Sequence, residues 1–126
     1  MTSKPVVRNW RVVTPYVDHE SAIIWPIYRG GEGYEHLPHE AAPLLGMVGF
    51  TIHRMQGGRS GDYHDHEDRE QVYYFTEGRG KMKLDDVIYE VRDGDAVHIP
   101  PKVKHQLIND SDDWIEHLLI TAPVRS

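Results

Sequence analysis

Three histidines and one glutamine are the side chains of this sequence whose types and spacing best fit a chemical role. His64 and His66 are separated by one residue, Gln71 follows five positions later, and His105 lies 34 residues beyond Gln71. Imidazole nitrogens combined with one oxygen donor suit zinc, nickel, copper, iron, cobalt or manganese. We therefore expect these four side chains to bind one divalent transition metal ion per chain.

The segments around these residues have the character of β-strands. Side chains two positions apart on a strand point to the same face, so His64 and His66 can aim at one point. After a short polar turn, a second strand is expected over residues 71–76, with positions 71, 73 and 75 on one face. His105 begins another apolar strand after two consecutive prolines. A barrel that joins these strands would bring the four side chains together.

The spacing of glycines, prolines and histidines around these residues resembles the two sequence motifs of the cupin family. The matching residues are Gly58, His64, His66, Gln71 and Gly78 in the first motif, and Gly94, Pro100, His105 and Asn109 in the second. The resemblance covers residues 45–122, and the 15 residues between the motifs are similar to the spacing in compact single-domain cupins. It implies a double-stranded β-helix, the jelly-roll barrel, with a metal site of three histidines and a glutamine.

Two positions depart from the usual cupin pattern. Gln71 stands where the family usually has an acidic ligand, and Glu70 precedes it. The spacing to Gly78 favours Gln71 as the ligand, through its amide oxygen, with Glu70 pointing away. The candidate partners of the Glu70 carboxylate are Arg69, Lys81 and Lys83. Lys102 replaces a glycine of the second motif, which indicates that this turn does not need a positive φ.

From residue 45 onward the pattern is that of an all-β domain. We expect strands over residues 47–55, 71–76, 81–84, 87–91, 96–99, 105–108 and 114–121. Short strands separated by frequent turn signals are typical of a sandwich or barrel. The 126 residues suit one domain. We place the barrel at 41–126, and 1–40 adds N-terminal strands and a loop to the same domain.

The N-terminal residues offer two further strands, over 11–13 and 22–28, with Pro26 at an edge or a bulge. In the family, such strands often pair across a dimer, and the alternative is that they extend the barrel of their own chain. We expect a homodimer, because a small barrel has sheet edges that need cover. Trp10, Trp25 and Tyr28 are large side chains that suit the interface.

The composition argues against several classes of protein. The net charge of −6 argues against nucleic acid as a partner, and the absence of cysteine excludes disulfides and thiolate ligands. The first residues lack the apolar core of a signal peptide, and the longest apolar-rich run, 44–52, is too short to span a bilayer. We therefore expect a cytoplasmic protein that has no membrane partner and binds a small molecule.

Arg54, Tyr73 and His98 are the candidate catalytic residues beside the metal. The Arg54 guanidinium could clamp a carboxylate, unless the side chain faces outward. Strand alternation prevents His53 and Arg54 from both facing inward. Tyr73 shares the face of the glutamine ligand and either donates a hydrogen bond or packs. His98 and His117 are either acid–base groups or buried, hydrogen-bonded histidines.

Two further histidines, His36 and His39, flank a proline in a loop-like segment. Nothing else in the sequence repeats their spacing. We expect them to be exposed loop residues rather than metal ligands.

The expected ligand set favours Lewis-acid chemistry. Neutral imidazoles and a neutral amide leave the full +2 charge of the ion to attract anionic oxygens, and donate little to a higher iron oxidation state. The resemblance agrees, since cupins with this set include unsaturated-uronate ketonising isomerases of pectin breakdown. We expect a metal-dependent isomerase or lyase for a small anionic, oxygen-rich substrate such as a keto acid or sugar acid. The alternatives are a metal-dependent dioxygenase and a non-catalytic module that binds a small ligand or a metal.

Overall fold

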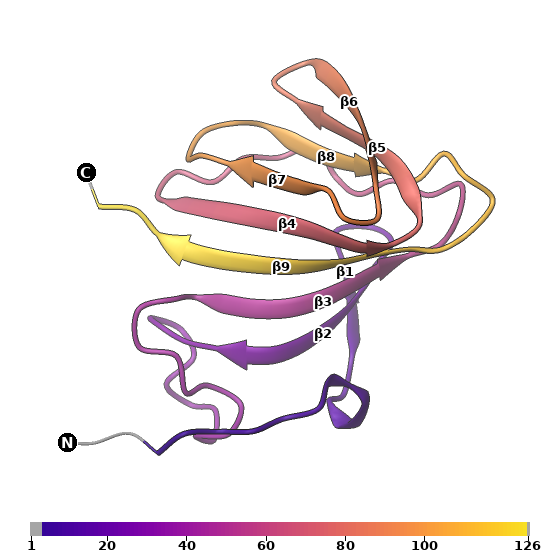
Figure 1. Cartoon of the computed structure of the whole chain (residues 1–126). Helices are drawn as coiled ribbons and strands as arrows, with labels where there is room; N and C mark the ends of the chain where they lie inside the picture. Colours follow the sequence, from indigo (N-terminus) through magenta and orange to yellow (C-terminus); the bar gives the residue numbers. More distant parts are fainter. Residues whose placement is uncertain (1–3, 126) are drawn as a thin grey trace.

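The computed structural model describes residues 4–125, and nearly all of its regular structure is β-strand (Figure 1). One short 3-10 helix, η1 (Trp10–Val12), precedes the strands. The strands are β1 (Tyr16–Asp18), β2 (Ala22–Arg29), β3 (Gly49–Met55), β4 (Arg69–Glu77), β5 (Arg79–Leu84), β6 (Val87–Arg92), β7 (Ala96–Ile99), β8 (His105–Ile108) and β9 (Ile115–Pro123). Within residues 4–125, no helix has the length and apolar character needed to cross a bilayer.

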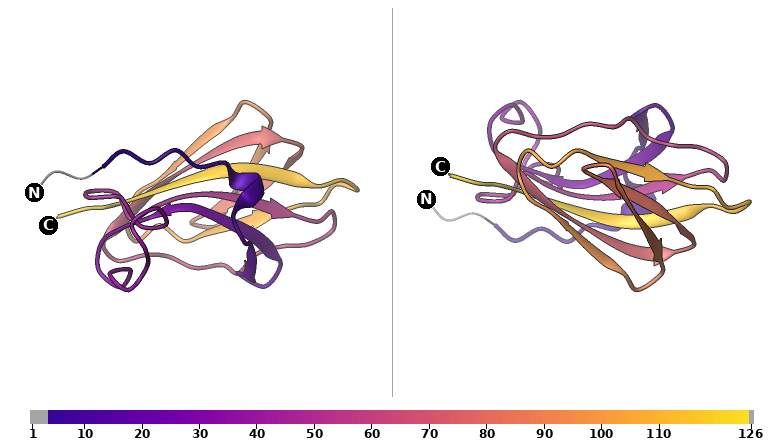
Figure 2. Two further views of the ribbon diagram at one scale, coloured as in Figure 1. Left: turned by 90° about the horizontal axis from the view of Figure 1, so that it is seen from below. Right: turned by 90° about the horizontal axis from the view of Figure 1, so that it is seen from above.

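The strands form two antiparallel sheets that enclose the core (Figures 1 and 2). The larger sheet has six strands in the order β1-β2-β3-β9-β4-β7, and the smaller has three in the order β6-β5-β8. Large buried side chains from both sheets meet in one cluster, including Phe75 and Ile115 from the larger sheet and Met82 and Leu107 from the smaller. This is the all-β jelly-roll barrel that the sequence predicted.

Strand alternation decides which residues of the larger sheet reach the interior. In β3 every second residue is buried, so His53 points inward and Arg54 points outward. The same alternation buries Gln71 on β4 and His117 on β9. Because β3, β9 and β4 are neighbours in the sheet, these inward polar residues line one continuous surface.

The strands predicted from residue 47 onward are confirmed, with shifts at their ends. The predicted hairpin joins β5 to β6 through Asp85 and Asp86, whose φ angles of 45° and 70° fit a two-residue hairpin turn. The predicted strand at 22–28 is β2. Its pairing with β3 shifts register between Pro26 and Tyr28, so the proline lies at an irregularity, as expected.

The start of the chain differs from the prediction, because η1 takes the place of the strand expected over 11–13. The side chain of Asn9 accepts a hydrogen bond from the backbone nitrogen of Arg11 at 2.9 Å. Asparagine side chains favour turns by bonding nearby backbone in this way. β1 pairs with β2, and β2 with β3 of the same chain. The N-terminal strands thus extend the larger sheet, and the homodimer stays a prediction.

The turn before β8 contains an uncommon backbone conformation. Lys102 has a φ of 67°, so the expectation that this turn does not need a positive φ is wrong. Residues with a side chain rarely adopt this conformation. Here it lets the backbone nitrogen of Lys102 donate to the carbonyl oxygen of His66 at 2.7 Å. The turn is therefore tied directly to a segment that carries a candidate metal ligand.

Candidate metal centre

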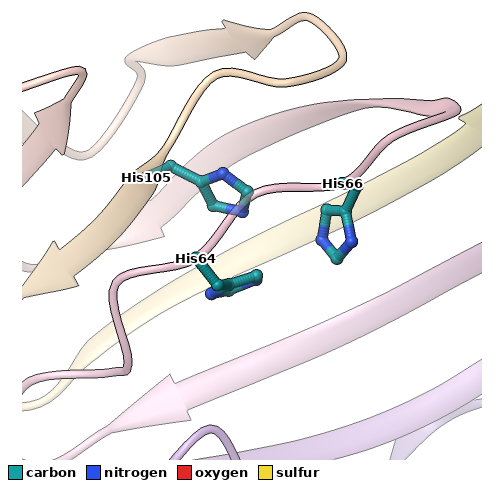
Figure 3. Close-up of side chains that lie close together, drawn as sticks. All are labelled: His64, His66 and His105. Carbon is teal, nitrogen blue, oxygen red and sulfur yellow. The ribbon is translucent and has the colours of Figure 1, made fainter.

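Three histidines from two separate segments come together beside β8. His64 and His66 lie between β3 and β4, and His105 is the first residue of β8. Their candidate ligand atoms lie within 4.8 Å of one another, and Figure 3 shows the three rings grouped around one region. The loop histidines His36 and His39 are exposed, as expected, and lie outside this group.

Backbone hydrogen bonds fix the two segments to each other. The backbone nitrogen of His105 donates to the carbonyl oxygen of His64 at 2.8 Å. In return, the backbone nitrogen of His64 donates to the carbonyl oxygen of His105 at 3.2 Å. The backbone nitrogen of Lys102 holds His66 in the same way from the preceding turn. The backbone positions of the three histidines are therefore set by the fold itself.

The hydrogen bonds of the imidazoles leave ring nitrogens free for a metal. Nδ1 of His105 lies 3.0 Å from the carbonyl oxygen of Val103, which assigns it the proton and leaves the lone pair on Nε2. That Nε2 atom is buried and has no hydrogen-bond partner among the described residues. Nδ1 of His64 lies 3.2 Å from the carbonyl oxygen of Asp62 and 3.3 Å from its Oδ2. A carbonyl or carboxylate behind an imidazole is the usual support of a metal-binding histidine.

Gln71 supplies an oxygen to the same cavity. It points inward from β4, is 8% exposed, and its Nε2 donates to Oγ1 of Thr121 at 3.2 Å. Its Oε1 is buried and unpartnered within residues 4–125. His64, His105 and Gln71 line one cavity. Buried polar atoms in native proteins are normally satisfied, so the free amide oxygen and the free imidazole nitrogen fit a bound cation.

Glu70 points away from the cavity, as expected from its place on the opposite face of β4. Its Oε1 lies 2.9 Å from Nε2 of His98, and its side chain is 45% exposed. The partner is therefore this histidine, and the expected pairing with Arg69, Lys81 or Lys83 is wrong. The structure thus turns the neutral Gln71 toward the histidines and the acidic Glu70 toward solvent.

Two of the candidate ligands, His105 and His66, have pKa values that favour the neutral, metal-binding form of the imidazole. The pKa of His105 is lowered to about 4, mainly by burial and in part by charge on His64 and His66, although the hydrogen bond to Val103 raises it. Burial also lowers the pKa of His66, again with a contribution from charge on His64. Neutral imidazoles need not lose a proton when they bind a metal, so the site is ready to accept one at neutral pH.

Tyr73 is the one predicted catalytic residue that the structure places in the cavity. It is 8% exposed, and its ring stacks on that of His117 at a centroid distance of 4.5 Å. Burial raises the pKa of the Tyr73 phenol. The hydroxyl therefore stays protonated at neutral pH and can donate a hydrogen bond but cannot supply a phenolate.

Arg54 and His98, the other two predicted catalytic residues, lie on the outer face of the larger sheet. Nε of Arg54 lies 3.7 Å from Oε1 of Glu116, and the guanidinium stacks over the Trp114 ring at 5.6 Å. The His98 side chain is 57% exposed and bonded to Glu70. The expectation that these residues line the cavity is wrong, because strand alternation directs both of them outward.

A comparison with known families decides where the chain belongs. The family model described as "Cupin domain" matches residues 51–121, which include every candidate metal ligand. This chain is a member of the cupin family. The two motifs recognised in the sequence are therefore cupin motifs, and in this cupin they place His64, His105 and an inward Gln71 at one cavity, with His66 close to the other two histidines.

This cupin is similar to a curated protein and to several solved structures. The uncharacterized protein MJ1618 of Methanocaldococcus jannaschii is 30% identical over 98% of this chain and 90% of its own. The crystal structure of a predicted oxalate decarboxylase from Thermotoga maritima superposes with a TM-score of 0.77 at 18% identity, covering 94% and 99% of the two chains. A protein from Acidithiobacillus ferrooxidans, provisionally assigned as a sugar phosphate isomerase, has a TM-score of 0.60 and 26% identity over 67% and 55% of the chains.

Two residues beside the candidate metal ligands of this cupin were not predicted from the sequence. His19 lies in the turn between β1 and β2, and its ring stacks on that of His64 at 5.0 Å. Its Nδ1 lies 2.9 Å from Oδ1 of Asp62, whose other carboxylate oxygen faces His64. The position of Asp62, two residues before His64, is a signal that could have identified it. No spacing in the sequence connects His19 to the site.

A second polar group lies farther along the interior wall of this cupin, where β3 pairs with β9. The rings of His53 and His117 are 4.9 Å apart, and Nε2 of His53 lies 2.9 Å from Oγ1 of Thr51. Burial lowers the pKa of His117 to about 3 and that of His53 well below its ordinary value. Both ring nitrogens of His117 are buried and unpartnered within the described chain. Each such atom costs about 1–3 kcal/mol if nothing satisfies it.

Proposed function

We propose that this cupin is a metal-dependent isomerase or lyase that acts on a small, anionic, oxygen-rich substrate such as a keto acid or a sugar acid. The observation that carries the proposal is the uncharged donor set. His64, His66 and His105 lie together, and the unpartnered amide oxygen of Gln71 belongs to a residue of the same cavity as His64 and His105. The carboxylate of Glu70 faces solvent. An ion held this way would keep its full +2 charge.

A divalent ion with that charge supplies Lewis-acid chemistry, since it polarises a carbonyl or acidifies a hydroxyl of a bound anion. The protein contributes fixed positions for its ligands through the backbone bonds of His64 and His105. Asp62 orients the His64 imidazole from behind. Buried side chains such as Tyr73 and Leu119 line the cavity, and electrostatic attraction is stronger in such surroundings than in water.

The relatives agree with this class of substrate. The Acidithiobacillus ferrooxidans protein shares 26% identity with this chain and is provisionally assigned to sugar phosphates, which are anionic and rich in oxygen. The Thermotoga maritima protein is a predicted oxalate decarboxylase, and its likeness at 18% identity supports the shared fold alone. An isomerase of a small anion is consistent with the Acidithiobacillus ferrooxidans protein.

The test is to load purified protein with each candidate metal and incubate it with a panel of keto acids and sugar acids in D₂O. Proton NMR would show isomerisation as exchange of a carbon-bound proton, and cleavage as new resonances. His66→Ala is the matched control, because it removes one ligand and leaves Tyr73 and the outer sheet in place. Stoichiometric oxygen uptake during turnover would instead support a dioxygenase. No turnover with one tightly retained ligand would support a binding module.

A further inference from the structure

His117 has two ring nitrogens that no described residue satisfies. The side chain is 3% exposed, and neither Nδ1 nor Nε2 has a hydrogen-bond partner within residues 4–125. A neutral imidazole carries one N–H donor and one lone-pair acceptor, and buried groups of both kinds are normally paired. Since His117 lines the same cavity as His64 and Gln71, the missing partner belongs inside that cavity.

The surroundings of His117 define what kind of group can meet it. Its ring packs against Tyr73 at 4.5 Å, Phe75 at 5.5 Å and His53 at 4.9 Å. Burial alone lowers its pKa, to about 3, and no neighbouring charge contributes. This part of the cavity therefore offers an uncharged donor and acceptor and no cation. It suits a hydroxyl group, which can donate and accept, rather than a carboxylate.

The distance between the metal ligands and His117 limits the length of a ligand that reaches both. The His105 ring lies 6.2 Å from Tyr73, and Tyr73 lies 4.5 Å from His117, so the two imidazoles are at most about 11 Å apart. The cavity has a volume of ≈ 40 Å³, enough for only a few water-sized groups. A molecule that spans these points inside the cavity has a short chain.

We propose that His117 is a ligand-binding residue that takes a hydroxyl group of a substrate whose anionic end lies at the metal centre. This inference rests on the proposed function, because it assumes that the anion binds at the metal. It narrows the substrate class to short keto acids or sugar acids with a hydroxyl group a few bonds from the carboxylate. His53, whose Nε2 faces Thr51, packs behind His117 and holds its ring in place.

The test compares keto acids that differ by one hydroxyl group. Zinc-loaded wild type, His117→Phe and His117→Gln would be titrated calorimetrically with pyruvate and hydroxypyruvate, and with 2-oxobutanoate and 4-hydroxy-2-oxobutanoate. Phenylalanine keeps a flat ring and removes both nitrogens, whereas glutamine keeps a donor and an acceptor. His117→Leu provides an apolar variant of another shape if the phenylalanine variant does not fold.

In the wild type, we expect the hydroxylated member of at least one pair to bind about threefold to tenfold more tightly, as one hydrogen bond contributes. The preference should vanish in the apolar variants and return in His117→Gln. Histidine-selective ¹⁵N NMR of the wild type should show the His117 nitrogens shifting with hydroxypyruvate more than with pyruvate, a readout that needs no variant.

Two other outcomes would overturn the inference in distinguishable ways. If both members of each pair bind the wild type and the apolar variants in the same ratio, His117 does not bind the hydroxyl, and the proposed function still stands. If none of the four acids binds the zinc-loaded wild type, the proposed substrate class is wrong, and the inference about His117 falls with it.

Discussion

The two faces of the larger sheet carry similar polar residues in opposite settings. The inner face holds Gln71 and His117, both buried and with atoms that lack partners among the described residues. The outer face holds Glu70 and His98, bonded to each other near solvent. Adjacent positions of one strand, 70 and 71, thus differ completely in environment. On this sheet the buried side-chain atoms without a hydrogen-bond partner in residues 4–125 lie on the inner face, except Nε of Arg54, which faces Glu116. This marks the inner face as the one that meets a ligand.

The largest expected effect is the loss of metal affinity when one of the three candidate histidine ligands is removed. His66→Ala should lose most of the bound metal, at least about 100-fold in affinity, since even residues behind a ligand are worth 10- to 100-fold. His36→Ala is the control, because that histidine is exposed in a loop. Metal content would be measured by inductively coupled plasma mass spectrometry. Equal metal content in both variants and the parent would contradict the assignment.

The next largest effect is a pH dependence of stability that arises from the buried His117 on the inner face. Above about pH 6.5 His117 is neutral in both the folded and the unfolded chain, so its ionisation does not affect stability. Below that pH His117 binds a proton in the unfolded chain, whereas in the folded chain it binds one only near pH 3. In the metal-free protein, the free energy of unfolding of the wild type should therefore fall relative to that of His117→Phe. The expected difference is about 1.4 kcal/mol for each unit by which the pH falls below 6.5. Urea titrations between pH 7 and pH 4.5 would measure the free energy of unfolding of both proteins. If the histidine were solvated, the two values would change with pH in parallel.

Exchanging the properties of positions 70 and 71 tests the two faces of β4 directly. Gln71→Glu should bind metal more tightly, because a carboxylate is the stronger donor, and Gln71→Ala should weaken binding about tenfold, by analogy with the loss of a supporting residue. Glu70→Ala should change metal affinity little. Competition with a chromophoric chelator would measure all three. If Glu70→Ala lost the metal and Gln71→Ala retained it, Glu70 would be the ligand instead of Gln71. That result would favour the alternative that the protein is a dioxygenase.

The smallest effect is expected on the outer face. Arg54→Ala removes a partly exposed ion pair with Glu116 and the stacking on Trp114, and exposed pairs contribute about 0–1 kcal/mol. Metal affinity should be unchanged, and thermal unfolding should shift by only a few degrees. A large loss of metal in this variant would show that the outer face supports the site.

Much of the fold and of the metal site is predictable because both depend on local spacing. Alternation places His64 and His66 on one side of an extended segment, and the distance from Gln71 to Gly78 fixes which of two neighbouring residues faces inward. The strand prediction succeeds from residue 47 onward for the same reason. Local patterns of this kind need no knowledge of which strands are neighbours.

Apart from η1, which a local bond to the Asn9 side chain accompanies, the errors arise where the outcome depends on contacts between distant segments. Alternation showed that His53 and Arg54 face opposite ways, but the pairing of β3 with β9, which sets His53 beside His117, decides which one is inside. His19 reaches the site through a turn 45 residues before His64. The left-handed backbone of Lys102 accompanies a hydrogen bond to His66. The glycine that the cupin motif has at this position indicated that conformation, but the lysine argued against it.

The reciprocal backbone bonds between His64 and His105 have a consequence for how the protein meets its metal. The two residues are 41 positions apart, and a crosslink between them would normally carry the entropic cost of closing that loop. Here the hydrogen bonds of the folded barrel have already closed it. Binding of an ion therefore requires little further ordering of the backbone, and its release need not unfold any segment. Chelators should strip it while the circular dichroism spectrum of the barrel stays the same, so that one folded protein can exchange metals many times.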